Sequence, residues 1–276
     1  MYYDEKTARE LVLEAGRKLI EKKLIARTWG NISARISEDE FIITPSGRAY
    51  DTLAASDLVK VRIGDLSVAG EGKPSSEKGI HAVAYLLRGE CAFIIHTHQF
   101  YASAVCAEGE DTAFAPCAKY GLPGTKKLMK NVKASIAANK SADCFLLEKH
   151  GALILGGSFD DAFEKAGKLE EVCRELFVSR IGNITEDEII PEFAKSQRAL
   201  RAYIDDFAQL VGLKASIEAA KLILPESDDC EAAEMVALKN CAAALYVKRA
   251  KPLGCFDVLL QRAVYRMKYS KLKDKK

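Results

Sequence analysis

The stretch Cys91-Ala92-Phe93-Ile94-Ile95-His96-Thr97-His98 places two of the chain's four histidines at the end of an apolar run. Such a run is typical of a buried strand, in which side chains alternate between the two faces with a period of two. His96 and His98 therefore project to the same side, whereas the same spacing on a helix would point them apart. Two convergent imidazoles are the beginning of a divalent-metal site, and zinc is the usual occupant. The alternative is a pair of strand-end histidines bonded to nearby backbone.

The composition of the 276 residues is that of an ordinary globular chain, with 49% hydrophobic residues, 29% charged residues and a net charge of +2. This balance does not favour a nucleic-acid partner. No apolar run approaches the roughly 20 residues that cross a bilayer, and the first residues do not follow the pattern of a secretory signal. Eight cysteines are scattered without a C-x-x-C pair, which is typical of reduced thiols. We therefore expect a cytoplasmic protein with no membrane partner.

Helix-like and strand-like patterns alternate along the first two thirds of the chain. Apolar spacing predicts helices over residues 5–23, 77–88, 100–107, 125–139 and 159–179. Short apolar runs between turn residues predict strands at 32–36, 41–44, 58–62, 66–69, 91–95, 143–147 and 152–155. Hairpin-like strands with interspersed helices predict an α/β fold with a central, mainly antiparallel or mixed β-sheet flanked by helices.

The chain changes character near residue 185. Helix-like segments separated by proline-containing breaks follow at 193–213, 232–248 and 255–269. No histidine occurs after His150, so we expect no metal ligands in this part. The pattern predicts a functional domain over residues 1–184 and a helical C-terminal extension over residues 185–276.

Three polar segments lie at predicted turns or helix starts. Ser75-Ser76-Glu77 precedes a helix, where Ser is a favoured N-cap and Glu suits the first turn. The same geometry offers an anion site at a helix N-terminus and a carboxylate for general acid–base work. Gly30-Asn31 and Thr44-Pro45-Ser46-Gly47 consist of residues that dominate turns for conformational reasons. Their backbone N–H and hydroxyl groups could instead converge with the serines on one phosphate.

His150-Gly151 supplies a third imidazole between two predicted apolar strands. One interpretation is a turn histidine beside a glycine that permits close approach of the backbone. The other joins His150 to His96 and His98, because three histidines with an open fourth position are what a catalytic zinc requires.

Taken in order, five motifs resemble those of the class II aldolase/adducin family: Gly30-Asn31-Ile32-Ser33, Thr44-Pro45-Ser46-Gly47, Ser75-Ser76-Glu77, His96-Thr97-His98 and Lys149-His150-Gly151. The resemblance covers roughly residues 5–180. Its motifs are more specific for the fold than for the reaction. It implies that Zn²⁺ is held by His96, His98 and His150 and that Glu77 is the catalytic acid/base. It also implies that the substrate phosphate is bound by Gly30, Asn31, Ser46, Gly47, Ser75 and Ser76.

The resemblance implies a zinc-dependent aldolase, a lyase of carbohydrate metabolism that cleaves or forms a carbon–carbon bond in a small phosphorylated ketose such as L-fuculose 1-phosphate. It also implies a homotetramer with sites at subunit boundaries and an assisting tyrosine from a neighbouring subunit, for which Tyr120 is a candidate. Alternatives on the same fold are a pentulose-phosphate 4-epimerase, which carries Asp where this chain has Glu77, and a methylthioribulose-phosphate dehydratase. The alternative from another class of protein is a non-catalytic adducin-like interaction module, which loses the metal ligands.

Overall fold

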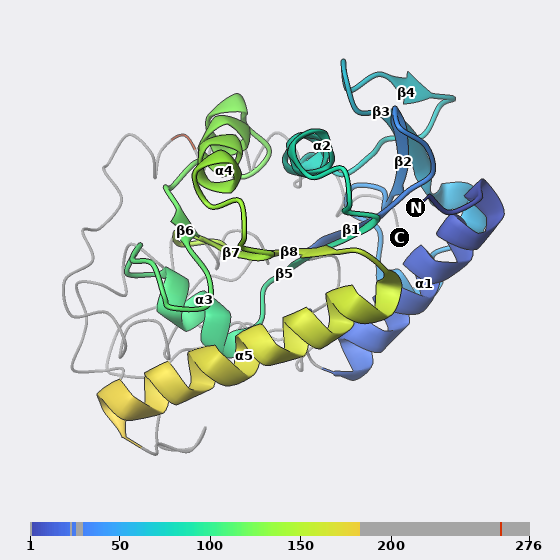
Figure 1. Cartoon of the computed structure of the whole chain (residues 1–276). Helices are drawn as coiled ribbons and strands as arrows, with labels where there is room; N and C mark the ends of the chain where they lie inside the picture. The colour runs from blue at the N-terminus through green and yellow to red at the C-terminus, as the bar shows by residue number, and fades with distance from the viewer. Residues whose placement is uncertain (1, 23, 26–29, 183–259, 261–276) are drawn as a thin grey trace.

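The computed structural model of the chain describes residues 2–22, 24–25, 30–182 and 260 (Figure 1). Within this part of the chain a sheet lies between two layers of helices. The predicted helical extension over residues 185–276 lies outside the described residues, apart from Leu260, and the division into two domains stays a prediction.

An eight-stranded sheet forms the centre of the molecule, in the order β4-β3-β2-β1-β5-β8-β7-β6. Its strands are β1 (Asn31–Arg35), β2 (Glu40–Ile43), β3 (Val59–Arg62), β4 (Val68–Ala69), β5 (Phe93–Thr97), β6 (Cys117–Ala118), β7 (Cys144–Leu147) and β8 (Gly151–Gly156). Neighbouring strands pair antiparallel except β6 and β7, which are parallel. The prediction of an α/β fold around a mainly antiparallel, mixed sheet is therefore confirmed.

Helices cover both faces of the sheet, as Figure 1 shows. One face carries α2 (Lys78–Leu87) and α4 (Lys126–Ala138), and the other carries α1 (Glu5–Glu21), α3 (Phe100–Cys106) and α5 (Phe159–Ile181). Two short 3₁₀ turns, Tyr50–Thr52 and Ala55–Asp57, lie between β2 and β3. The first backbone N–H groups of α1, α4 and α5 are capped by the side chains of Asp4, Thr125 and Ser158, in the usual way of polar N-cap residues.

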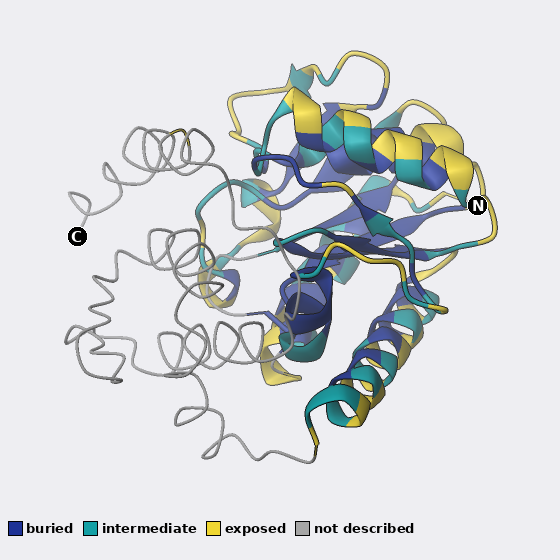
Figure 2. Cartoon of the chain, turned by 90° about the vertical axis from the view of Figure 1, so that its left-hand side faces the viewer, coloured by how far each residue is buried: buried dark blue, intermediate teal, exposed yellow. Residues whose placement is uncertain are grey.

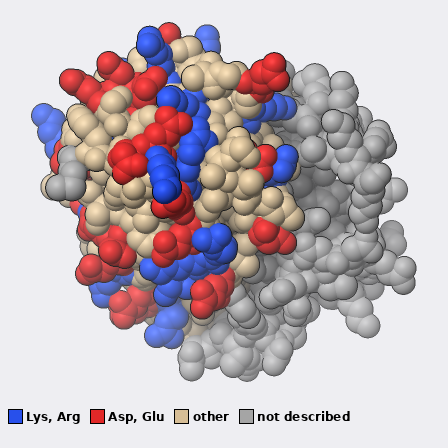
Figure 3. All heavy atoms as spheres, turned by 90° about the vertical axis from the view of Figure 1, so that its right-hand side faces the viewer, with Lys and Arg blue, Asp and Glu red and all other residues tan. Residues whose placement is uncertain are grey.

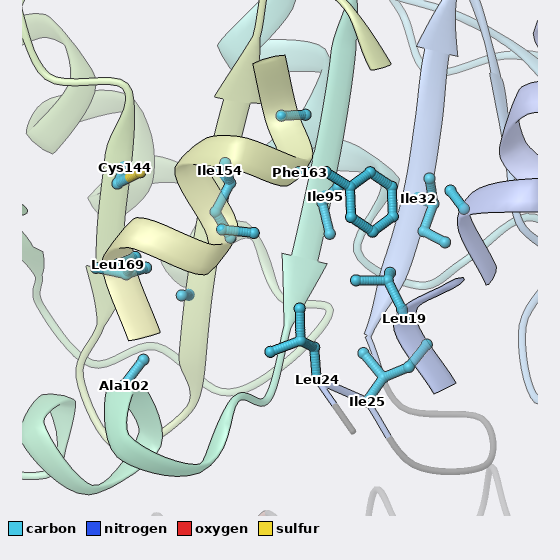
Figure 4. Packing of buried hydrophobic residues seen from close by; sticks show 14 of the residues in the cluster. Leu19, Leu24, Ile25, Ile32, Ile95, Ala102, Cys144, Ile154, Phe163 and Leu169 are labelled. Atoms are coloured by element: carbon cyan, nitrogen blue, oxygen red, sulfur yellow. The ribbon is translucent and has the colours of Figure 1, made fainter. Parts of the chain in front are cut away.

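Two apolar clusters fill the spaces between the sheet and its helices. The cluster under α1, α3 and α5 contains Ile32 and Ile95 from the sheet and Phe163 from α5 (Figure 4). The cluster under α2 and α4 contains Ile94 and Leu153. Because both faces are covered, β5 and β8 are buried along their whole length. Figure 2 shows strands in the middle of the sheet in dark blue, the colour of buried residues. Burial on both faces explains why these strands have continuous apolar sequences rather than alternating ones.

Every helix and strand predicted within residues 1–182 is present, with its ends shifted by a residue or two. The shift matters at β5, which continues through Thr97 and therefore includes His96. β6 is missing from the sequence-based prediction because a two-residue strand has no periodic pattern to detect.

The described surface and thiols agree with the composition. On the face shown in Figure 3, basic and acidic side chains are interspersed, and neither sign forms a continuous patch. The described cysteines that the structure shows as free thiols are Cys91, Cys106, Cys117, Cys144 and Cys173. Among the described helices, none is long and apolar enough to cross a membrane.

Candidate active site

Three histidines converge where β5 and β8 lie side by side. His96 lies in β5, His98 follows that strand, and His150 immediately precedes β8. The antiparallel register sets Thr97 opposite Ala152, which brings the start of β8 next to the end of β5. The potential ligand atoms of the three histidines all lie within 4.8 Å of one another, and all three side chains are buried. The structure thus brings together the three residues that the sequence proposes as metal ligands.

Two glycines allow the backbone to pass close to the histidine strand. A Cβ on Gly151 would lie 2.3 Å from the carbonyl oxygen of Thr97, and a Cβ on Gly30 would lie 2.4 Å from that of His96. Gly30 also has a φ of 74°, in the left-handed region that residues with a Cβ disfavour. The glycines of the Gly30-Asn31 and His150-Gly151 motifs therefore have a steric role beside the cluster.

The hydrogen bond of His96 determines which of its ring nitrogens faces the other histidines. Nδ1 lies 2.8 Å from the carbonyl oxygen of Ala152, and because a carbonyl only accepts, Nδ1 carries the proton. In the neutral ring Nε2 then presents a lone pair, and it lies 3.2 Å from Nε2 of His98 and 3.3 Å from Oε2 of Glu77. The lone pair of His96 and the carboxylate of Glu77 therefore face each other, as the donors of a metal site do.

The donor set fits a zinc ion. Nitrogen ligands at about 2.0–2.1 Å in a tetrahedral arrangement are about 3.3 Å apart, and Nε2 of His96 is 3.2 Å from Nε2 of His98. A backbone carbonyl on the second ring nitrogen, as on His96, is a common outer support of a histidine ligand. Oε1 of Glu77 and Nδ1 of His150 are buried and have no hydrogen-bond partner among the described residues. Such unsatisfied atoms are typical of a functional site.

Glu77 stands at the start of α2, but its carboxylate faces the histidines. The side chain makes no capping hydrogen bond to α2. Oε1 instead lies 3.3 Å from Nε2 of His150, and Oε2 lies 3.3 Å from Nε2 of His96. The turn is stabilised by Ser75, whose Oγ accepts a hydrogen bond from the backbone N–H of Glu77 at 3.2 Å. Asn31 Nδ2 donates to Oε2 of Glu77 at 3.0 Å.

Burial and charge act in opposite directions on Glu77. Burial raises the pKa of its carboxyl group, but the imidazoles of His150 and His96 lower it by more when they carry a second proton, so the pKa lies below its ordinary value. Burial lowers the pKa of His150 to about 4, so this ring supplies little charge at neutral pH. The hydrogen bond from Asn31 then favours the ionised carboxylate. An ionised carboxylate beside neutral imidazoles is the protonation state that binds a divalent metal.

The structure joins the three polar loops. Ser46 N–H donates to the carbonyl of Lys73 and Ser75 N–H donates to that of Thr44, both at 3.0 Å. Thr44 also contacts the Gly30-Asn31 segment, because its Oγ1 accepts from Ile32 N–H at 3.2 Å. The residues proposed for phosphate binding therefore lie on neighbouring segments: Gly30, Asn31, Ser46, Gly47, Ser75 and Ser76. The Asn31 amide itself contacts Glu77 through Nδ2 and His81 through Oδ1.

His81, the fourth histidine, is not among the site residues that the sequence predicts. It lies one turn after Glu77 on α2, is fully buried, and bonds to Asn31 and Ser33. Its signal in the sequence is the four-residue spacing of Glu77, His81 and Tyr85, which places three polar side chains on one face of a helix. Tyr120, the candidate assisting residue, lies between β6 and α4, and its role in a neighbouring subunit stays a prediction.

Comparisons with known proteins identify relatives of this chain. Residues 10–177 match the family model described as the class II aldolase and adducin N-terminal domain. The chain is 28% identical over 204 residues to a 3-oxo-tetronate 4-phosphate decarboxylase of Pectobacterium atrosepticum, covering 67% of this chain and 92% of that protein. It is 30% identical over 196 residues to a 5-deoxy-D-ribulose 1-phosphate aldolase of Bacillus thuringiensis serovar kurstaki, covering 67% of this chain and 90% of that protein.

Solved structures share the fold of the described region. An L-fuculose 1-phosphate aldolase superposes with a TM-score of 0.56 at 28% identity, covering 62% of this chain and 84% of the other. A sugar-phosphate aldolase from Thermotoga maritima superposes with a TM-score of 0.52 at 21% identity, covering 64% of this chain and 98% of the other. The region matched by the family model includes the three histidines and Glu77.

Proposed function

Because the chain belongs to the class II aldolase and adducin family, we propose that it is a zinc-dependent lyase. It breaks or forms a carbon–carbon bond beside the carbonyl group of a small phosphorylated sugar. The observation that carries the proposal is the buried cluster in which His96, His98 and His150 meet the carboxylate of Glu77. Burying the carboxylate of Glu77 among three imidazoles costs free energy, which metal binding and catalysis explain and a passive interaction module does not.

Each residue of the cluster has a definite part in this chemistry. The three imidazoles hold the zinc ion, which when bound supplies a Lewis acid for the substrate carbonyl and for the negative charge that develops on its oxygen. Glu77 moves the proton to and from the carbon at which the bond breaks, as a general acid/base. Asn31 orients the carboxylate through Oε2. The burial of these side chains excludes bulk water from the reacting groups.

The substrates named for the two relatives yield the same reaction product. A 3-oxo-tetronate 4-phosphate that loses its carboxylate as CO₂ becomes an enediolate of carbons 2 and 3, with the phosphate on the adjacent carbon. Cleavage of 5-deoxy-D-ribulose 1-phosphate between carbons 3 and 4 releases acetaldehyde and leaves an enediolate of carbons 2 and 3, again beside the phosphorylated carbon. Protonation of either enediolate gives dihydroxyacetone phosphate.

This shared three-carbon fragment defines the substrate class that we propose. The joined polar loops bind its phosphate and so orient the reacting carbon relative to the zinc ion and Glu77. Aldol cleavage of a ketose 1-phosphate is the first candidate reaction, and L-fuculose 1-phosphate is one such ketose. Decarboxylation of a phosphorylated 3-oxo sugar acid is the second, and the Pectobacterium relative favours it.

The remaining alternatives have less support. Residue 77 is Glu, whereas the epimerase pattern carries Asp, and adducin-like modules lose the ligands that converge here. The homotetramer with sites at subunit boundaries and the cytoplasmic location stay predictions. Sedimentation of the purified chain tests the first, since a fully active monomer would contradict it.

A product assay on the zinc-reconstituted full chain tests the proposed reaction. Dihydroxyacetone phosphate is measured by NADH oxidation with glycerol-3-phosphate dehydrogenase, starting from L-fuculose, L-rhamnulose or 5-deoxy-D-ribulose 1-phosphate, or from 3-oxo-tetronate 4-phosphate. We expect turnover of at least one of these substrates, and loss of turnover on chelation of the metal. Ribulose 5-phosphate and methylthioribulose 1-phosphate test epimerase and dehydratase activity in parallel. Turnover of only these two, or of no substrate by zinc-loaded protein, would contradict the proposal.

A further inference from the structure

A buried polar ladder joins α2 to β1. Glu77, His81 and Tyr85 recur every four residues along the helix, a rise of about 6 Å. Asn31 and Ser33 recur every two residues along the strand, a rise of about 6.6 Å. Because the two rises nearly match, side chains of helix and strand alternate, and each contacts the next through a hydrogen bond. All five side chains are buried.

The hydrogen bonds of this ladder have one consistent direction. An ionised Glu77 only accepts, so Asn31 presents Nδ2 to it. Oδ1 of Asn31 then faces Nε2 of His81, and because Oδ1 only accepts, Nε2 carries the ring proton. Nδ1 of His81 accepts from Ser33 Oγ at 2.7 Å, and that oxygen accepts from the Tyr85 hydroxyl at 2.8 Å. Burial lowers the pKa of His81 to about 3, in keeping with a neutral ring.

We propose that His81 is the positioning residue for the carboxylate of Glu77. By donating from Nε2 it fixes the Asn31 amide, which holds Oε2 of Glu77 and leaves Oε1 to exchange the proton with the substrate. Oε1 fits this role because it is buried, faces Nε2 of His150 at 3.3 Å and has no hydrogen-bond partner among the described residues. Without the His81 donor, the Asn31 amide is free to turn its oxygen toward the carboxylate. The inference rests on the proposed function, since it assigns proton transfer to one atom of Glu77.

Two substitutions of His81 distinguish the effect of its donated hydrogen bond on kcat from the effect of its packing. The amide of His81→Gln reaches about as far as Nε2 of the imidazole and can donate to Asn31, whereas His81→Leu cannot. In the zinc-loaded full chain, we expect His81→Leu to lower kcat about 10- to 100-fold, the usual effect of removing an outer support at a metal site. KM and zinc content should change little, and His81→Gln should recover most of the lost kcat.

Val83→Ala is the matched control for packing. Val83 lies on the same helix in the apolar cluster under α2 and α4, and no hydrogen bond of the ladder involves it. This variant should lower the melting temperature and leave kcat unchanged. The proposal is overturned if His81→Leu loses no more kcat than Val83→Ala, or if His81→Gln is as slow as His81→Leu.

The tautomer of His81 can be measured without an activity assay. Nitrogen-15 NMR of the zinc-loaded chain, with the His81 signals assigned by their loss in His81→Gln, should show a proton on Nε2 and a lone pair on Nδ1. A proton on Nδ1 would reverse the ladder and overturn the proposal. If the wild-type chain turns over none of the substrates, the proposed function fails, while the tautomer still decides whether His81 donates to Asn31.

Discussion

All four histidines of the chain are buried, yet they occupy two different environments. Around His96, His98 and His150, ring nitrogens and a carboxylate face one another at 3.2–3.3 Å. His81 has a partner on each nitrogen, Asn31 on Nε2 and Ser33 on Nδ1. The first arrangement turns a lone pair of His96 and the carboxylate of Glu77 toward each other, as the donors of a metal site are turned, whereas each ring nitrogen of His81 has a hydrogen-bond partner.

The difference shows that the partners of its nitrogens, rather than its burial, decide what a histidine does. The carbonyl of Ala152 places the proton of His96 on Nδ1 and leaves a lone pair on Nε2. The amide oxygen of Asn31 places the proton of His81 on Nε2. These opposite tautomers suit opposite tasks, because a metal ligand needs a lone pair and a hydrogen-bond donor needs a proton.

The largest expected effect is on the three-histidine cluster. His96→Ala and His150→Ala should each remove zinc and reduce turnover to background, because a catalytic site needs all three ligands. Circular dichroism and the melting transition should remain those of a folded protein, since two apolar clusters support the sheet without the metal. Unfolding of either variant would show instead that the cluster is structural.

Glu77→Gln comes next. The amide is nearly isosteric but cannot exchange a proton, so we expect turnover to fall roughly 10²- to 10⁴-fold while zinc stays bound. The free energy of unfolding should change little, because the Glu77 side chain makes no capping hydrogen bond to α2 and an amide oxygen can still accept from Asn31. Steady-state kinetics, metal analysis and urea unfolding of the same preparation check these outcomes. Unchanged turnover would remove the carboxylate from the chemistry.

A smaller effect is expected at the polar loops. Ser76→Ala removes a hydroxyl group proposed to bind the substrate phosphate, and a lost hydrogen bond to a charged group weakens binding by about 1.5–3 kcal/mol. We therefore expect kcat/KM to fall roughly 10- to 100-fold and inhibition by inorganic phosphate to weaken. Ser179→Ala, at an exposed hydroxyl near the end of α5, is the control. Equal kinetics for both variants would place the phosphate elsewhere.

The last effect concerns acid stability rather than turnover, and it follows from the burial of His81. Burial lowers its pKa to about 3 in the folded chain, against about 6.5 in an unfolded chain. Between these values the unfolded chain binds the proton and the folded chain does not. The contribution to stability is therefore fully present above about pH 6.5 and falls by about 1.4 kcal/mol per unit as the pH decreases toward 3.

His81→Gln removes this dependence. Urea unfolding of the zinc-free protein between pH 7 and 4 should give a shallower loss of stability for His81→Gln than for the wild type. Val83→Ala should retain the wild-type slope, because it changes packing and no titrating group. Identical slopes for the wild type and His81→Gln would mean that His81 is protonated in the folded chain.

The sequence predicts those parts of the site that lie within a single strand or motif. A strand period of two specifies that His96 and His98 converge, and the motif order supplies His150 and Glu77 through the family resemblance. No periodic pattern reveals that β8 lies beside β5, although this order brings His150 to the cluster. Strand order depends on packing between segments that are distant in the chain.

The polar ladder cannot be predicted from the sequence for the same reason. Asn31 and His81 are 50 residues apart, and their contact depends on how α2 is seated on β1. The motif that contains Asn31 indicates a phosphate loop, whereas the structure shows that its amide contacts Glu77. Helix spacing places Glu77, His81 and Tyr85 on one face, but it does not identify the strand that this face meets.

Zinc K-edge X-ray absorption of the reconstituted full chain, combined with metal analysis, tests whether the three histidines bind zinc. We expect one zinc ion per chain with three nitrogen ligands at about 2.0–2.1 Å and an exchangeable oxygen ligand. His150→Ala should lose a nitrogen ligand or the metal, and His81→Gln should give the wild-type spectrum. A chain that binds no metal after reconstitution, or a zinc spectrum that His150→Ala leaves unchanged, would contradict a three-histidine zinc site.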